Sequence, residues 1–288
     1  RDYAADLTRL VLSGMRELGV TKEEINGKRI LLKPNLVEVH GERPYINTHP
    51  LMIRGAVEAF LHLGAAKVLV GEGPGHSRDT LRLVDESGLF DVLSEDRIAF
   101  VDLNYDDAYP LRNQGRFSRL KELYFPATLR EVDWVVSMPK LKTHHWAGIT
   151  VSMKNLFGLM PGLYYGWPKN VLHHVGITET ILDINTTIGP RFAIVDGIVG
   201  MEGDGPIMGT AKPAGVVVMG RNLTAVDATC ARIMGINPKR IPYLGKAAGR
   251  LGPIGERNIL QRGESVGSVR TNFELLDYIP AHRGLRKN

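Results

Sequence analysis

The chain has 288 residues, of which 43% are hydrophobic and 23% charged, the composition of a globular protein that can bury a sizeable core. Its formal charge of +5 comes mostly from scattered basic residues without interleaved aromatic ones, so the sequence disfavours nucleic-acid binding and favours a small anionic ligand. Cys230 is the single cysteine, which excludes an internal disulfide and a cysteine-ligated iron–sulfur cluster. No stretch approaches the roughly 20 apolar residues of a membrane span. We expect a soluble protein, either cytoplasmic or exported after removal of an N-terminal signal.

Apolar runs and helical patterns alternate along the chain. The runs are short and almost continuously apolar, as strands buried on both faces are. Asn, Thr, Gly and Pro residues at the ends of several helical patterns mark helix boundaries. In chain order, we expect a helix over 5–18, a strand over 29–33, a helix over 50–63, a strand over 67–71, a helix over 79–86, strands over 98–103 and 132–138, a helix over 177–187, strands over 192–198 and 215–220, and helices over 223–234 and 240–249.

This alternation predicts an α/β fold in which helices flank a mainly parallel sheet. No linker or internal repeat divides the chain, so we expect a single domain over residues 1–288. The segment at about 104–126 is polar, basic and weakly periodic, and we interpret it as an excursion from the sheet. It is the candidate contact surface for a protein partner or for a second copy of the chain.

Several polar segments follow expected strands, at the edge where ligands collect in parallel sheets. Lys33 and Asn35 follow the first strand, and the turn GEGPGHS follows the second. Its glycines let backbone amides approach an anion, with His76 and Ser77 beside them. We expect these four residues to help bind a small anionic molecule.

The segment KLKTHHWAGITVSMKNLFG, from residue 140 to 158, combines lysines and histidines with little apolar periodicity. A neutral imidazole can accept a proton near neutral pH, and a lysine can hold a carboxylate or phosphate group. We therefore expect His144 and Lys154 to be catalytic. Lys140, Lys142 and Thr143 are the candidate anion-binding residues of this segment.

Histidines and acids further along the chain suggest a metal site. His173 and His174 stand at the start of the helix expected over 177–187, where the helix dipole favours a neutral, ligand-competent imidazole. Asp196 and Glu202 belong to the glycine-rich stretch DGIVGMEGDGP. We expect His173, His174 and Asp196 to be candidate ligands of a divalent metal, nickel or another, and Glu202 to be a candidate catalytic residue.

Long motifs carry a family resemblance. The stretches LLKPNLV, GEGPGHS, VSMPKLKTHHWAGITVSMKNLFG, IVDGIVGMEGDGP and LTAVDATCARIMG resemble the domain of unknown function family 362 over nearly the whole chain. The family name carries no reaction. Many relatives have an appended ferredoxin-like module with cysteine ligands, which we do not expect here because the chain lacks those cysteines.

A more distant resemblance is to the N-terminal part of lactate racemase, which uses a nickel pincer nucleotide tethered to a lysine. His144, Ala147-Gly148, Lys154 and Met160-Pro161-Gly162 match its pattern in order. The resemblance implies that His144 is an acid/base, Lys154 a tether or an anion-binding cation, and His173 a metal ligand. The sequence departs from the pattern at Tyr105, where the racemase has its second acid/base histidine, so racemisation by paired histidines is in doubt.

Three functional hypotheses follow, and we favour the first. The chain is an enzyme that moves a proton or hydride through His144 on a small carboxylate- or phosphate-bearing substrate, with an unidentified cofactor or a divalent metal. Alternatively, it is a metal-dependent hydrolase or transferase that uses Asp196 and Glu202. A third alternative is a non-catalytic binding or assembly component that docks through the 104–126 segment.

Overall fold

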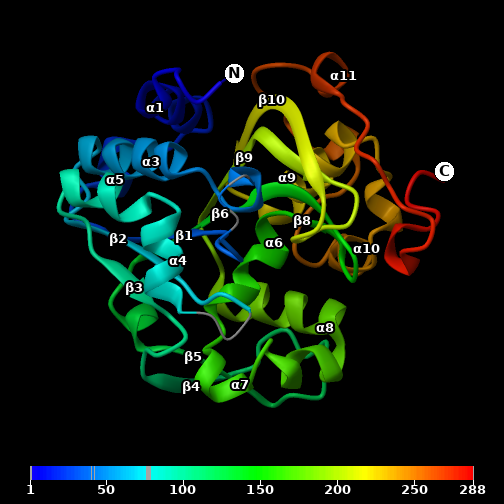
Figure 1. Cartoon of the computed structure of the whole chain (residues 1–288), viewed down its shortest axis with the longest axis horizontal. Helices are drawn as coiled ribbons and strands as arrows, with labels where there is room; N and C mark the ends of the chain where they lie inside the picture. The colour runs from blue at the N-terminus through cyan, green and yellow to red at the C-terminus, as the bar shows by residue number, and fades with distance from the viewer. Residues whose placement is uncertain (1, 40, 42, 76–78, 288) are drawn as a thin grey trace.

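A mixed sheet runs through the centre of the computed structural model (Figure 1). The structure describes residues 2–39, 41, 43–75 and 79–287, and within them the eight strands of this sheet follow the order β3–β2–β1–β6–β9–β7–β8, with β10 paired to β9. The parallel strands are β1 (Arg29–Pro34), β2 (Lys67–Glu72), β3 (Phe100–Asp102), β6 (Trp134–Met138), β7 (Lys140–His144) and β9 (Phe192–Glu202).

Two strands run against this direction. β8 (Gly148–Thr150) pairs antiparallel with β7, and β10 (Thr210–Gly220) pairs antiparallel with β9. The parallel pairs still outnumber these two. The predicted α/β fold with a mainly parallel sheet is therefore confirmed.

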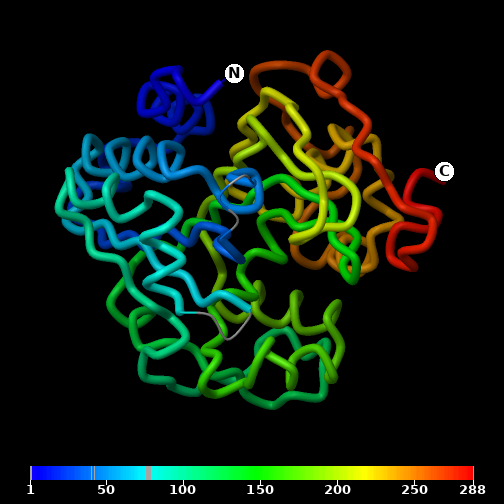
Figure 2. Tube along the Cα trace, in the orientation of Figure 1, coloured from blue at the N-terminus to red at the C-terminus, as the bar shows by residue number. Residues whose placement is uncertain are grey.

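Helices cover both faces of the sheet (Figure 1). One face carries α1 (Leu7–Glu17), α2 (Lys22–Ile25), α3 (Pro50–His62), α4 (Thr80–Glu86) and α5 (Leu89–Glu95). The other face carries α6 (Ser152–Asn155), α7 (Gly162–Tyr165), α8 (Asn170–Ile188), α9 (Leu223–Ile233) and α10 (Pro242–Ala247). Beyond α10 the chain runs along the outside of that second layer and includes the short α11 (Val266–Val269) (Figure 2).

The strands are apolar because both of their faces are buried. In β1, Ile30 and Leu32 belong to the core under α1 and α3, whereas Leu31 belongs to the core under α8 and α9. Successive side chains of a strand point to opposite faces, so a strand between two helical layers must be apolar at every position.

The segment that follows β6 forms a strand, β7, that the sequence analysis did not predict. Pro139 separates β6 from β7, and both pair with β9, since Val136 lies opposite Phe192 and Lys140 opposite Asp196. The alternation of Lys140, Lys142 and His144 hides this strand in the sequence because lysine is rarely buried. Here both lysines are fully buried and have polar partners.

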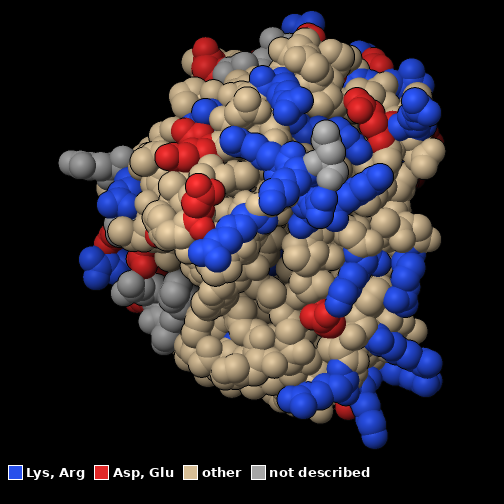
Figure 3. All heavy atoms as spheres, turned by 90° about the vertical axis from the view of Figure 1, so that its right-hand side faces the viewer, with Lys and Arg blue, Asp and Glu red and all other residues tan. Residues whose placement is uncertain are grey.

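The 104–126 segment holds a second, two-stranded sheet formed by β4 (Ala108–Arg112) and β5 (Glu122–Pro126). Leu123 and Phe125 are buried in the core that also contains α8. Its exposed basic residues are Arg112, Arg116, Arg119 and Lys121. Lys and Arg side chains are prominent over the side of the molecule drawn in Figure 3.

A break in α8 shapes the start of that helix. Gly176 has a φ of 125°, so the helical turn from Asn170 is separated from the long stretch that ends at Ile188. A positive φ of this size favours glycine because it strains any residue with a Cβ atom. Among the described residues, no helix is both long and apolar enough to cross a membrane.

Candidate functional site

A pocket of about 140 Å³ lies at the carboxyl ends of β1 and β2, where the sequence predicted a site. The loops after these strands, β7, α6 and the first turn of α8 form its walls. Its apolar lining includes Val37, Trp146 and Phe157. The polar and charged lining residues are Lys33, Asn35, Glu72, Lys142, His144, His145, Thr150, Lys154, Asn155, Lys169 and His173.

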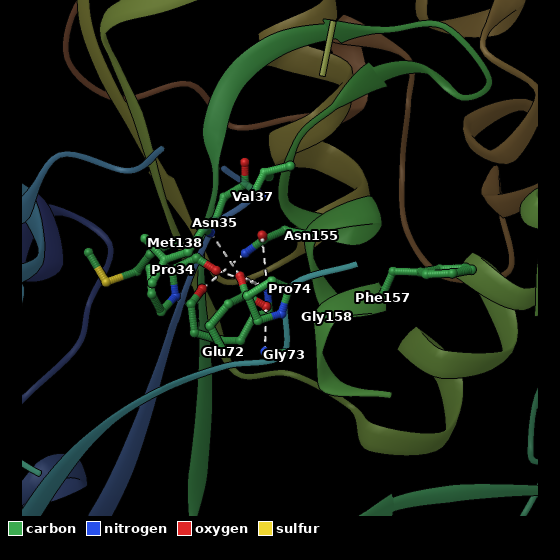
Figure 4. Close-up of polar contacts among 12 residues, drawn as sticks. Pro34, Asn35, Val37, Glu72, Gly73, Pro74, Met138, Asn155, Phe157 and Gly158 are labelled. Carbon is green, nitrogen blue, oxygen red and sulfur yellow. Dashed lines mark hydrogen bonds and ion pairs between the residues drawn. The ribbon is translucent and has the colours of Figure 1, made fainter. Parts of the chain in front are cut away.

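Lys33 and Glu72 form a buried ion pair beneath the pocket. The Lys33 Nζ lies 2.6 Å from the Glu72 Oε2 and also donates to Asn155 Oδ1 at 3.1 Å and to the Pro34 carbonyl at 2.8 Å. Figure 4 shows Glu72 and Asn155 turned toward each other, whereas Phe157 points away from them. All hydrogen-bond donors of the Lys33 ammonium are therefore occupied, and its role is to fix the ends of β1 and β2.

Gly158 lets the chain pass directly over this ion pair. A Cβ atom at this position would lie 2.1 Å from the Glu72 Oε1 and 2.4 Å from the Lys33 Nζ. Both atoms are held by other contacts, so neither can retreat. Only glycine fits between the ion pair and the pocket.

Two further lysines are held by backbone carbonyl groups. The Lys142 Nζ donates to Ile46 O at 2.9 Å and to Pro206 O at 3.2 Å. The Lys169 Nζ donates to Gly73 O at 2.7 Å and also contacts the carbonyls of residues 157 and 158. Burial lowers the pKa of Lys142 well below its usual value and that of Lys169 to about 7. Sequence reasoning missed Lys169, because no motif marks it.

Lys154 is held differently. Its Nζ lies 4.6 Å from the centre of the Phe157 ring, and it has no hydrogen bond or ion pair to any other residue that the structure describes. Desolvation and the nearby Lys33 lower the pKa of Lys154 to about 8. Among the described residues, the other three pocket lysines are bonded to protein oxygens, so the Lys154 amine is the one that is available to a ligand.

Two histidines of the pocket present opposite hydrogen-bonding edges. The His144 Nδ1 accepts from the backbone amides of Trp146 and Ala147, at 3.0 and 3.2 Å, so the neutral ring carries its proton on Nε2. The His173 Nδ1 lies 3.1 Å from the Lys169 carbonyl and must carry the proton there, which leaves a lone pair on Nε2. His144 can thus donate a hydrogen bond, and His173 can accept a proton.

Both rings are neutral at physiological pH. Burial is the main cause in each case, and the neighbouring Lys154 adds a repulsive positive charge. The pKa of His173 falls to about 4, and that of His144 falls well below its usual value. Phe157 contacts the His173 ring at a centroid distance of 5.0 Å, so the same aromatic ring touches both His173 and Lys154.

The charges of the pocket do not balance. Lys33, Lys142, Lys154 and Lys169 line it, and Glu72 is the one carboxylate among its described lining residues. Asn35 Oδ1 and Thr150 Oγ1 are buried without a hydrogen-bond partner in the described part of the chain. Buried polar groups normally find partners, so a bound molecule with negative charge and hydrogen-bonding groups would complete the site.

Three expected binding or metal-ligating residues lie outside this pocket. Lys140 and Asp196 form a separate buried ion pair with 2.6 Å between the Nζ and the Oδ2. Asp196 also accepts from the Tyr3 hydroxyl and from the backbone amide of His49, so its oxygens are already bonded. Thr143 donates to Gly203 O at 2.8 Å and likewise does not line the pocket.

Glu202 and His174 are also not part of the pocket lining. Glu202 pairs with Lys212 at 2.9 Å and accepts from the backbone amide of Glu274. His174 is exposed. His76 and Ser77 lie outside the described residues.

The predicted metal site does not fit this arrangement. Of its three expected ligands, His173 alone lines the pocket, whereas Asp196 is bonded to Lys140 and His174 is exposed. Within residues 2–39, 41, 43–75 and 79–287, no group of three His, Cys, Asp or Glu side chains could share an ion. The donor set thus does not support a nickel site or another site for a divalent metal.

A buried carboxylate behind the pocket positions α6. The Asp227 Oδ1 accepts from the Ser152 amide at 2.8 Å and from the Ser152 hydroxyl, and Oδ2 accepts from the Met153 amide at 3.2 Å and the Tyr243 hydroxyl at 2.9 Å. These bonds fix the first turn of the short helix that carries Lys154. Asp227 is therefore a structural residue that positions Lys154.

Comparison with known proteins places the chain in a family. Residues 30–232 match the model described as "Domain of unknown function (DUF362)". The "Thylakoid-associated protein sll1697" of Synechocystis sp. (strain ATCC 27184 / PCC 6803 / Kazusa) is 28% identical over 238 residues, which cover 78% of this chain and 68% of that protein.

A solved structure is also similar, although distantly. The lactate racemase apoprotein from Thermoanaerobacterium thermosaccharolyticum is 15% identical with a TM-score of 0.44, and the match covers 76% of this chain and 54% of that one. The chain thus spans about half the length of the racemase. Because the family model matches well over half of the chain, the predicted family is confirmed, and the protein belongs to the domain of unknown function family DUF362.

Proposed function

We propose that the pocket binds a small molecule with a carboxylate or phosphate group and that the protein is an enzyme that transfers a proton on this molecule. The excess of lysines over carboxylates in the pocket lining carries the proposal. An ammonium group buried without a counter-charge costs several kcal/mol, and a bound anion removes much of that cost. The scattered basic surface adds long-range attraction for such an anion.

The two histidines have different roles in the proposed proton transfer. The His144 Nε2–H donates to an oxygen of the anion, and the lone pair on His173 Nε2 accepts a proton from the substrate. This differs from the expectation that His144 is the base, because two backbone amides occupy its only lone pair. The apolar side chains of Val37, Trp146 and Phe157 face the remainder of the substrate.

The binding half is tested by calorimetric titration with inorganic phosphate and with malonate. We expect Lys154→Ala to weaken binding about 10- to 100-fold, the typical effect of losing a charged hydrogen bond, whereas Lys154→Arg keeps most of the affinity. Binding should also weaken above about pH 8, since Lys154 then loses its proton. Lys121→Ala, on the exposed hairpin, is the matched control.

The proton-transfer part of the proposal is tested with malonate, because its C–H bonds are acidic. In heavy water, the wild-type protein should accelerate exchange of these hydrogens for deuterium, measured by NMR, and His173→Gln should abolish the acceleration while malonate still binds. A wild-type protein that binds neither anion, or that Lys154→Ala leaves unchanged in affinity, would contradict the proposed site. Binding without exchange would leave an anion-binding protein and remove the enzymatic role.

A further inference from the structure

Lys154 stands apart from the other three pocket lysines in what its amine contacts. Lys33 is bonded to a carboxylate and two further oxygens, and Lys142 and Lys169 are bonded to backbone carbonyls. The Lys154 amine lies against the Phe157 ring and has no hydrogen-bond acceptor among the described residues. An amine without acceptors keeps its lone pair accessible once the proton has left.

The surroundings of Lys154 favour the unprotonated amine. Its side chain is partly buried beside Phe157, and the nearby Lys33 ammonium opposes a second positive charge. With a pKa of about 8, about a quarter of the Lys154 amines are neutral at about pH 7.5, against about 0.1% for an ordinary lysine. Desolvation and neighbouring cations are the two conditions that turn a lysine into a nucleophile.

The same pocket offers what a carbonyl electrophile needs. The His144 Nε2–H and the Thr150 hydroxyl, which is buried without a hydrogen-bond partner among the described residues, can both donate to an acidic group of the ligand. The His173 Nε2 can accept and return a proton, and the Phe157 ring contacts both this imidazole and the Lys154 amine within the one pocket. A carbonyl carbon next to the acidic group would then lie between the amine and the base.

We infer that the Lys154 amine forms an imine with a small acid that bears an aldehyde or 2-oxo group. The inference rests on the proposed anion-binding function of this pocket. The nitrogen lone pair forms a bond to the carbonyl carbon, and the carbonyl π electrons move to the oxygen. His173 accepts one proton from the nitrogen and passes it to this oxygen, which gives a carbinolamine. The second nitrogen proton then passes by way of His173 to the hydroxyl group, the C–O bond breaks, and the oxygen leaves as water. The overall change is amine plus carbonyl to imine plus water, with no oxidation or reduction.

The test is reductive trapping of the imine in the intact protein. Wild-type protein is incubated with pyruvate or glyoxylate and sodium cyanoborohydride at about pH 7.5, and modified lysines are mapped by peptide mass spectrometry. From the neutral fractions, we expect Lys154 to be modified at least about tenfold faster than the exposed Lys121. Lactate, which has a hydroxyl group in place of the 2-oxo group of pyruvate, should give no modification.

Lys154→Arg separates the imine from the anion site, because arginine keeps the positive charge but does not form a stable imine. It should still bind pyruvate in calorimetry, and the rapid trapping should vanish. Wild-type protein that binds pyruvate but is trapped at Lys154 no faster than at Lys121 would overturn the imine and leave the anion site intact. Failure of both pyruvate and glyoxylate to bind or be trapped would overturn this inference, and failure of phosphate and malonate as well would overturn the proposed function.

Discussion

Burial in the pocket lowers the pKa of lysine side chains in the folded protein below their values in the unfolded chain. The pKa of Lys169 is about 7 in the folded state, where burial penalises the ammonium form, and about 10.5 when the chain is unfolded. Between these values the unfolded chain binds more protons than the folded one. The free energy of unfolding must therefore rise with pH over this window.

For Lys169 alone, we expect the free energy of unfolding to increase by about 2 kcal/mol between about pH 7 and pH 9. Urea unfolding followed by circular dichroism at several pH values measures this increase. Lys169→Met should flatten the curve, and saturating phosphate should do so in the wild-type protein by keeping the ammonium groups charged. A stability that falls steadily over this range would show that Lys169 stays protonated.

At this scale the sequence located much of the pocket. Lys33, Asn35, Lys142, His144, Lys154 and His173 were all expected at a site, and all line the pocket. Their roles at the site stay predictions. Lys169 could not be predicted, because it is defined by the carbonyls of residues 73, 157 and 158, which the fold brings together across long sequence separations. Asp196 is the opposite case, because it was expected at the site but lies outside the pocket. Its acidic, glycine-rich sequence context gives no sign that Lys140 forms an ion pair with it.

Among the elements, α6 has too few residues to be stable by itself. Asp227 compensates by accepting from two backbone amides of its first turn. Burial raises the pKa of Asp227 to about 6, although four donors oppose the shift, so the carboxylate is mainly ionised at neutral pH. The position of Lys154 thus depends on a residue of α9.

We expect Asp227→Ala to lower the free energy of unfolding by about 3 kcal/mol or more, since it leaves several buried donors without an acceptor. Tyr243→Phe, which removes one of those donors and leaves the carboxylate in place, should cost only about 1 kcal/mol. Urea unfolding of both variants gives the comparison. Equal losses would mean that α6 does not rely on the carboxylate.

Element prediction succeeded where periodicity and burial agree. Strands β1, β2, β6 and β9 and helices α1, α3 and α9 lie within a few residues of the expected ranges. The elements that build the pocket were harder, because β7 alternates charged residues that become buried and α6 is a single turn held by distant contacts. The break at Gly176 likewise hid the first turn of α8, which carries His173.

For the whole molecule, one sheet separates two apolar cores. Neighbouring residues of the same strand contribute to different cores, as Ile30 and Leu31 do. Because the two cores share the same strands, loss of packing in one core disrupts strands on which the other core depends. A single domain over the chain remains our proposal, and so does a docking role for the hairpin formed by β4 and β5.

We expect a single unfolding transition. Trp134 lies in the core under α3, and Trp146 contacts His173 of α8, which covers the other face of the sheet, so variants that retain only one of these tryptophans report on the two helical layers separately. Their fluorescence midpoints in urea should coincide with each other and with the loss of helical circular dichroism. Two separated midpoints would show that the two cores unfold independently and would contradict the single domain.

The bonds of Lys169 to the carbonyls of residues 73, 157 and 158 also have a consequence for how the protein is made. During synthesis the loop after β2 is complete long before Lys169 leaves the ribosome, and Pro206, which also borders the pocket, follows later still. The Gly73 carbonyl of this loop therefore stays without its Lys169 partner until more than ninety further residues have been synthesised. The pocket is therefore among the last features of this region to assemble, and a nascent chain that stops short of residue 206 has no complete binding site.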